Sequence, residues 1–117
     1  MSTRFFAYGT LRQGQAPEEI ALAVARLVPL GRGMARGRRF DLGAYPGAVF
    51  SDASGDVVEG EMYEVPDDGL WMDLDAYEGF DPNDRVGSLF VRKQVTVRIM
   101  ESEEEVLCWA YEYNRTG

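Results

Sequence analysis

The 117-residue sequence contains no histidine and a single cysteine, Cys108. The absence of histidine excludes Ser-His-Asp and Cys-His catalysis, metal sites built on imidazole, and imidazole acid-base chemistry. One cysteine forms neither an intrachain disulfide nor a zinc cage, and an odd thiol is typical of a reducing compartment. Proton transfer in an active site of this chain therefore falls to carboxyl groups, and we expect the protein to be cytoplasmic.

Long apolar runs and long basic runs are also missing. No segment approaches the ~20 apolar residues that span a bilayer, and the first residues lead into a strand-like segment with no signal-peptide core. The formal net charge is −8, so the chain repels phosphate backbones overall. The contrary feature is a cluster of arginines, interpreted as a solvated strand or loop edge, with an anionic-ligand patch as the alternative. The cluster comprises Arg32, Arg36, Arg38 and Arg39. We expect no nucleic-acid partner and no membrane partner.

The remaining composition, 45% hydrophobic with 13 glycines, suits one compact domain over residues 1–117. Apolar periodicity and turn residues predict the elements of this domain. They are strands over 4–8, 57–65, 89–100 and 106–113, a glycine-punctuated hairpin over 30–50, and helices over 17–27 and 68–78. The predicted fold class is α+β, a small mixed and mainly antiparallel β-barrel of about six strands with two short flanking helices.

Three short patterns imitate cofactor motifs and fail on spacing or residue type. Residues 31–37 have one residue too many for a dinucleotide-binding G-x-G-x-x-G, and residues 9–14 have P-loop glycine spacing without the phosphate lysine. An EF-hand counted from Asp73 places Glu78 at the obligatory glycine. The acids of that region are therefore interpreted as solvated: Asp73, Asp75, Asp81 and Asp84. We expect no cofactor and no metal.

The corner Tyr8-Gly9-Thr10-Leu11 is the first candidate site. A glycine directly after a buried strand lets the backbone approach a ligand closely, and the amides that follow can donate to a carboxylate or an oxyanion. The alternative is a tight turn closed by Thr10.

Glu78 is the second candidate. It is the last residue of a predicted helix, where the negative end of the macrodipole disfavours a carboxylate, and its flanks include Tyr77 and Phe80. Both effects raise its pKa, so its carboxyl could take up and return a proton near neutral pH. The alternative is an exposed glutamate at a helix end.

Six motifs in order along the chain carry a family resemblance. They lie at 6–14 (FAYGTLRQG), 41–47 (DLGAYPG), 58–65 (VEGEMYEV), 74–79 (LDAYEG), 89–97 (LFVRKQVTV) and 109–113 (WAYEY). Together they resemble the gamma-glutamylcyclotransferase-like proteins, in the branch closest to gamma-glutamylamine cyclotransferase. The sequence departs from the family pattern at residues 15–18 and at Phe90, where tyrosine is usual, so we expect substrate contacts there to differ.

The resemblance implies a barrel whose cavity holds a small-molecule gamma-glutamyl substrate, bound by the corner residues Tyr8, Gly9, Thr10 and Leu11. It implies that Glu78 is the catalytic acid and base. The substrate's own α-amine attacks its γ-carbonyl, which gives 5-oxoproline and a free amine or amino acid without a cofactor or metal.

Two alternatives to an enzyme stay open. One is a non-catalytic binding module for a small amino-acid-like metabolite in the same pocket, and the other is an interaction domain that uses the acidic C-terminal half. The presence of Glu78 favours the enzyme. The released amine and the oligomeric state do not follow from the sequence.

Overall fold

The computed structural model describes residues 3–9, 14, 16–43 and 46–114. In this part of the chain, six strands and two helices follow one another, which confirms the predicted α+β class. They are β1 (Arg4–Ala7), α1 (Glu18–Ala25), β2 (Val28–Asp41), β3 (Pro46–Phe50), β4 (Val57–Glu64), α2 (Asp68–Glu78), β5 (Phe90–Ile99) and β6 (Glu105–Tyr113).

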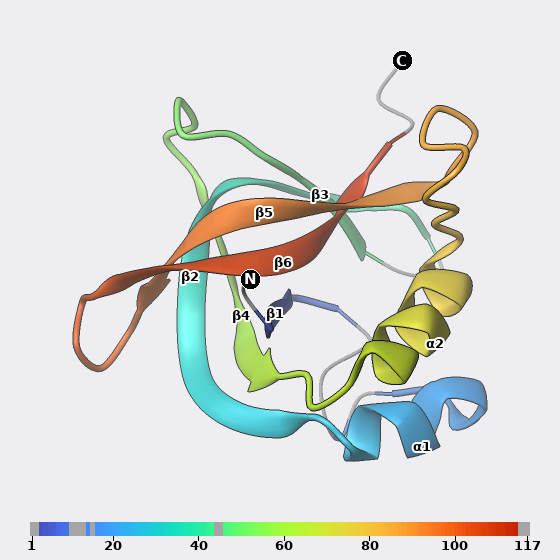
Figure 1. The fold of residues 1–117 in the computed structure, drawn as a ribbon. Helices are drawn as coiled ribbons and strands as arrows, with labels where there is room; N and C mark the ends of the chain where they lie inside the picture. Colours follow the sequence, from blue (N-terminus) through green and yellow to red (C-terminus); the bar gives the residue numbers. More distant parts are fainter. Residues whose placement is uncertain (1–2, 10–13, 15, 44–45, 115–117) are drawn as a thin grey trace.

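The sheet closes into a barrel. Its strand order is β3-β2-β4-β1-β6-β5, and an additional pairing of β2 with β5 joins the two sides. Five strands therefore form the barrel, and β3 extends it as a sixth strand on β2 (Figure 1). The β1–β6 pair is parallel, with Phe5 opposite Trp109, and the other pairs are antiparallel. The predicted mixed, mainly antiparallel barrel is confirmed.

Strand β2 makes this closure possible because it pairs with three partners along its length. Its first part pairs with β4, its centre also contacts β5, and its last residues form the hairpin with β3. The register shifts between Pro29 and Gly31, where Gly31 has a φ of 126°. A side chain at Gly33 would place its Cβ 2.6 Å from Val97 Cγ1. Glycine there lets β2 and β5 approach closely enough to close the barrel.

Capping residues define both ends of helix α2. The Asp67 carboxylate accepts a hydrogen bond from the Leu70 amide at 2.9 Å, which caps the N-terminus. Gly79 ends the helix with a φ of 71°, in the left-handed region that favours glycine. The predicted helix over residues 68–78 is confirmed, and an ion pair between Arg26 and Asp67 joins the end of α1 to its start. Neither described helix is long and apolar enough to cross a membrane.

Two hydrophobic clusters lie on opposite faces of the sheet, and β1 contributes alternate residues to both. Phe5 and Ala7 join the cluster that α1 and α2 pack against. Phe6 and Tyr8 join a cluster made by strand residues and the corner after β1, without helix residues. This alternation is the period of two that a strand buried on both faces requires. The end of β1 therefore lies where the barrel interior meets the helices.

Candidate active site

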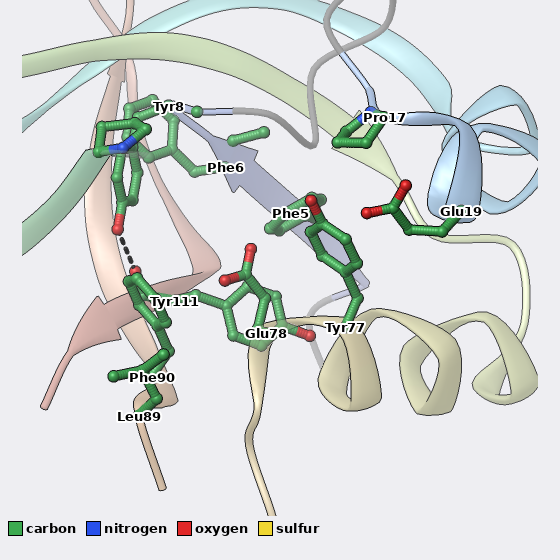
Figure 2. A pocket seen from close by; sticks show the side chains of 13 residues that line it. Phe5, Phe6, Tyr8, Pro17, Glu19, Tyr77, Glu78, Leu89, Phe90 and Tyr111 are labelled. Atoms are coloured by element: carbon green, nitrogen blue, oxygen red, sulfur yellow. Dashed lines mark hydrogen bonds between the residues drawn. The ribbon is translucent and has the colours of Figure 1, made fainter. Parts of the chain in front are cut away.

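A cavity of about 400 Å³ opens at the end of β1, bounded by the C-terminus of α2 and the start of α1 (Figure 2). Its walls include Tyr8 and Gly9 from the predicted corner, and Tyr77 and Glu78 from the end of α2. Phe5, Phe90 and Tyr111 contribute aromatic surface. The structure thus brings the first half of the corner and Glu78 to one cavity. Thr10 and Leu11 lie outside the described residues, so their binding role stays a prediction.

The Glu78 carboxyl points into this cavity (Figure 2). Its position as the last residue of α2, with Gly79 turning the chain away, directs the side chain off the helix end. The Glu78 carboxyl makes no hydrogen bond or ion pair with another residue of the described ranges. Burial raises the pKa of Glu78 from 4.5 to about 7. Removal from water is thus the cause that the structure identifies, and the carboxyl is suited to exchange protons near neutral pH.

Tyr8 is buried on the cavity wall, and a hydrogen bond to β6 fixes its side chain. Its hydroxyl donates to the backbone oxygen of Tyr111 at 2.6 Å (Figure 2). Burial, and then the nearby charge of Glu78, raise the pKa of Tyr8 far above its usual value, so the hydroxyl stays protonated. Gly9 follows on the cavity wall, where an added Cβ would lie 3.1 Å from Pro46 Cγ.

Asp75 lies one helical turn before Glu78, and its environment corrects a prediction. The sequence interpretation placed it in solvent, but it is only 8% exposed. The Tyr111 hydroxyl donates to Asp75 Oδ1 at 2.6 Å, and Arg92 Nε lies 3.5 Å from the same oxygen. The Arg92 guanidinium also stacks over the Trp71 ring, 4.6 Å from its centroid. Burial raises the pKa of Asp75, while the Tyr111 hydrogen bond and the Arg92 charge oppose that rise.

These bonds connect the walls of the cavity. Asp75 on α2 holds Tyr111 on β6, and Tyr111 in turn accepts from Tyr8 after β1. Sequence reasoning did not find this chain of hydrogen bonds, because its members are far apart along the sequence. The only signal was that each of the three lies in one of the motifs that carry the family resemblance.

The other acids of the failed EF-hand pattern stay exposed, as predicted. Asp81 Oδ1 accepts from the Asn83 amide at 2.9 Å, and Asp84 Oδ1 accepts from the Gly87 amide at 3.0 Å. They therefore stabilise the loop between α2 and β5. In the described part of the chain, no group of three or more His, Cys, Asp or Glu side chains is placed to hold a metal ion.

The four arginines of β2 are exposed, as predicted. The predicted strand or loop edge is wrong, because β2 lies between β3 and β4 in the sheet and pairs with both. Two of the arginines reach acceptors of the loop before β4: Arg36 donates to the Ser54 oxygen at 3.3 Å, and Arg38 lies 3.9 Å from Asp56. Cys108 is buried in β6, and burial raises the pKa of its thiol to about 11. It is a thiol at neutral pH, as its apolar neighbours predicted.

Comparison with known proteins identifies the class that this barrel and cavity define. Residues 5–117 match the family described as "Gamma-glutamyl cyclotransferase, AIG2-like". A Drosophila melanogaster protein named "Putative gamma-glutamylcyclotransferase CG2811" is 32% identical over 123 residues, which cover 95% of this chain and 69% of that protein. The chain belongs to the gamma-glutamyl cyclotransferase, AIG2-like family, and the resemblance carried by the sequence motifs is confirmed.

Solved structures show the same fold. An AIG2-like protein from Mus musculus matches 98% of this chain and 79% of its own, with a TM-score of 0.73 and 24% identity. YkqA from Bacillus subtilis matches 97% of this chain with a TM-score of 0.72 and 23% identity. The match covers 36% of YkqA, so this chain spans about a third of that protein. At these identities the likeness is one of fold.

Proposed function

We propose that this protein is a cytoplasmic gamma-glutamyl cyclotransferase, with residues 1–117 as one catalytic domain. It cleaves a gamma-glutamyl amide and releases 5-oxoproline and a free amine or amino acid. Family membership supports the reaction class. The observation that carries the assignment is the Glu78 carboxyl, which is unpartnered among the described residues, has a pKa of about 7, and faces the same cavity as Tyr8 and Gly9.

The reaction needs one proton carrier and no added nucleophile. Glu78 as carboxylate takes a proton from the substrate's α-ammonium group, and the freed amine attacks the γ-carbonyl carbon. A ring C–N bond forms, and the carbonyl oxygen becomes an oxyanion. Glu78 then returns the proton to the departing nitrogen, and its C–N bond breaks as the oxyanion collapses to the ring carbonyl. The ring nitrogen loses its second proton through Glu78 to the released amine, which leaves the neutral lactam and an ammonium group. No water is consumed, and the same carboxyl serves as base and as acid.

The corner after β1 has the complementary role in this proposal. Gly9 lets the backbone approach the gamma-glutamyl unit closely, and the amides of Thr10 and Leu11 donate to its anionic groups or to the oxyanion. Tyr8 stays neutral and fixes the start of the corner through its bond to Tyr111. The aromatic walls favour a folded substrate in which amine and carbonyl are adjacent. Holding such a conformer is the main contribution that an intramolecular reaction requires from a protein.

The test is release of 5-oxoproline from a panel of gamma-glutamyl amines, gamma-glutamyl dipeptides and glutathione, assayed with a metal chelator present. We expect at least one panel member to yield 5-oxoproline in the chelator, and Glu78→Gln to abolish most of that release. Binding of a panel member without release would contradict the enzyme and support the alternative, a binding module for an amino-acid-like metabolite.

A further inference from the structure

Glu19 is a second carboxylate on the wall of the cavity. It lies in the first turn of α1 and lines the cavity together with Pro17 and Tyr77. In the view of Figure 2, its carboxyl points toward the Tyr77 hydroxyl, on the side of Glu78 away from Tyr8. Unlike Glu78, Glu19 is exposed to solvent. It therefore lies at the mouth of the cavity, while Glu78 lies inside.

On the described part of the cavity wall, the charged side chains have one sign. Among the described residues that line it, Glu19 and Glu78 are the charged side chains, and neither arginine nor lysine is present. The N-terminus of a helix ordinarily attracts anions through its free amides. At α1 this attraction is offset by two acids in the first turn, Glu18 and Glu19, of which only Glu19 lines the cavity. The described part of the mouth therefore disfavours a carboxylate and favours a cation.

The proposed reaction assigns the two ends of the cavity to different parts of the substrate. The gamma-glutamyl unit must reach both the corner at Gly9 and the Glu78 carboxyl. The departing amine then extends from Glu78 toward Pro17, Tyr77 and Glu19. The Tyr77 ring offers apolar surface for a methylene chain along this path.

We propose that Glu19 is a specificity-determining residue, which selects gamma-glutamyl amides whose departing amine carries a second, protonated amino group and no carboxylate. This inference rests on the proposed function and narrows its substrate class to gamma-glutamyl diamines. Because Glu19 is exposed, water and salt screen its charge. The preference it produces is therefore modest, about three- to fivefold per unit of substrate charge, as for other exposed ion pairs.

The test uses three amides of similar length that differ at the far end. Glutamate is joined through its γ-carboxyl to one nitrogen of diaminobutane, to butylamine, or to the nitrogen of aminobutanoate, which gives cationic, neutral and anionic ends. The measured quantity is kcat/KM for each charged amide divided by kcat/KM for the neutral one. For the parent enzyme we expect a ratio above one for the cationic amide and below one for the anionic amide.

Variants at Glu19 should move both ratios. Glu19→Gln is expected to lower the cationic ratio about three- to fivefold and to raise the anionic ratio, and Glu19→Lys should invert the preference. Glu18→Gln is the matched control, because Glu18 lies in the same helical turn but is not on the cavity wall. It should leave both ratios unchanged. Added salt should reduce the preference of the parent and have little effect on Glu19→Gln.

The outcomes separate this inference from the proposed function. Release of 5-oxoproline from all three amides at ratios near one, or equal effects of Glu18→Gln and Glu19→Gln, would overturn the role of Glu19 and leave the cyclotransferase intact. Release from none of the three, with release from a gamma-glutamyl dipeptide or glutathione, would overturn the role of Glu19 alone, and release from no member of the whole panel would overturn both proposals. A preference for the anionic amide would show that α1 binds a carboxylate instead.

Discussion

Asp75 and Glu78 lie one turn apart on α2, and their surroundings differ in hydrogen-bond partners and in access to the cavity. Burial raises the pKa of both. Asp75 has two partners that oppose this rise, the Tyr111 hydroxyl at 2.6 Å and Arg92 Nε at 3.5 Å. The Glu78 carboxyl has no hydrogen-bond or ion-pair partner in the described ranges, and it faces the cavity.

The difference separates a structural carboxyl from a reactive one. A buried acid with a hydroxyl donor and a guanidinium stabilises the packing of the elements that supply them. In a buried acid without partners, the charged form is destabilised by loss of hydration, so the acid takes up a proton more readily. The partners of Asp75 and the cavity in front of Glu78 together distinguish the acid that can exchange protons with a substrate.

The largest expected effect is on turnover by Glu78→Gln. The amide has nearly the same shape but cannot accept the proton of the α-ammonium group, so we expect 5-oxoproline release to fall by about 10²-fold or more. The measurement is kcat/KM on a substrate identified from the panel, with circular dichroism to confirm the fold. Equal rates for variant and parent would remove Glu78 from the mechanism.

The next largest effect is expected on stability, when Asp75 is replaced. Asp75→Asn removes the charge that faces Arg92 and weakens the bond from Tyr111, so we expect the free energy of unfolding to fall by about 2 to 3 kcal/mol. Urea denaturation measures it. Asp73→Asn on the exposed face of the same helix is the control and should change stability by less than about 0.5 kcal/mol. Equal losses of stability for Asp75→Asn and Asp73→Asn would contradict the structural role of Asp75.

Much of the fold could be predicted because its signals are local. The bounds of α2 follow from an acid that caps its start and from Gly79 at its end, and the structure reproduces them. The closing contact of the barrel could not be predicted, since it depends on Gly33 of β2 meeting residues of β5 more than 60 positions away.

Some residues of the candidate site could likewise be predicted from the sequence, and others could not. Glu78 could be predicted because its helix-end position and apolar neighbours are contiguous in sequence. The burial of Asp75 could not, because its partners Tyr111 and Arg92 lie 36 and 17 residues further along the chain. Glu19 could not be singled out, since the sequence does not show which of two adjacent acids, Glu18 or Glu19, faces the cavity.

A smaller effect is expected in the pH dependence of stability. The folded-state pKa of Glu78, about 7, lies above its ordinary value of 4.5. Between these values the unfolded chain loses the proton before the folded chain does, so the stability contributed by the protonated carboxyl is lost as pH rises toward 7. We expect Glu78→Gln to be more stable than the parent by about 1 to 2 kcal/mol at pH 8, and by less at pH 5. A difference independent of pH would contradict the raised pKa.

The smallest effect is expected at Cys108, a buried group that takes no part in the reaction. Its thiol, with a pKa of about 11, is protonated at neutral pH and packs among strand residues. Cys108→Ala should cost about 1 kcal/mol of stability through lost packing and leave kcat unchanged. A loss of turnover in a folded Cys108→Ala protein would indicate a thiol nucleophile in place of the substrate's amine.

The most direct test of the central claim is the identity of the product formed in water enriched in heavy oxygen. Intramolecular attack by the α-amine predicts 5-oxoproline without heavy oxygen, together with one equivalent of free amine, both detected by mass spectrometry. Glutamate carrying heavy oxygen would contradict the account, because it would show that water, rather than the substrate's own amine, attacks the γ-carbonyl.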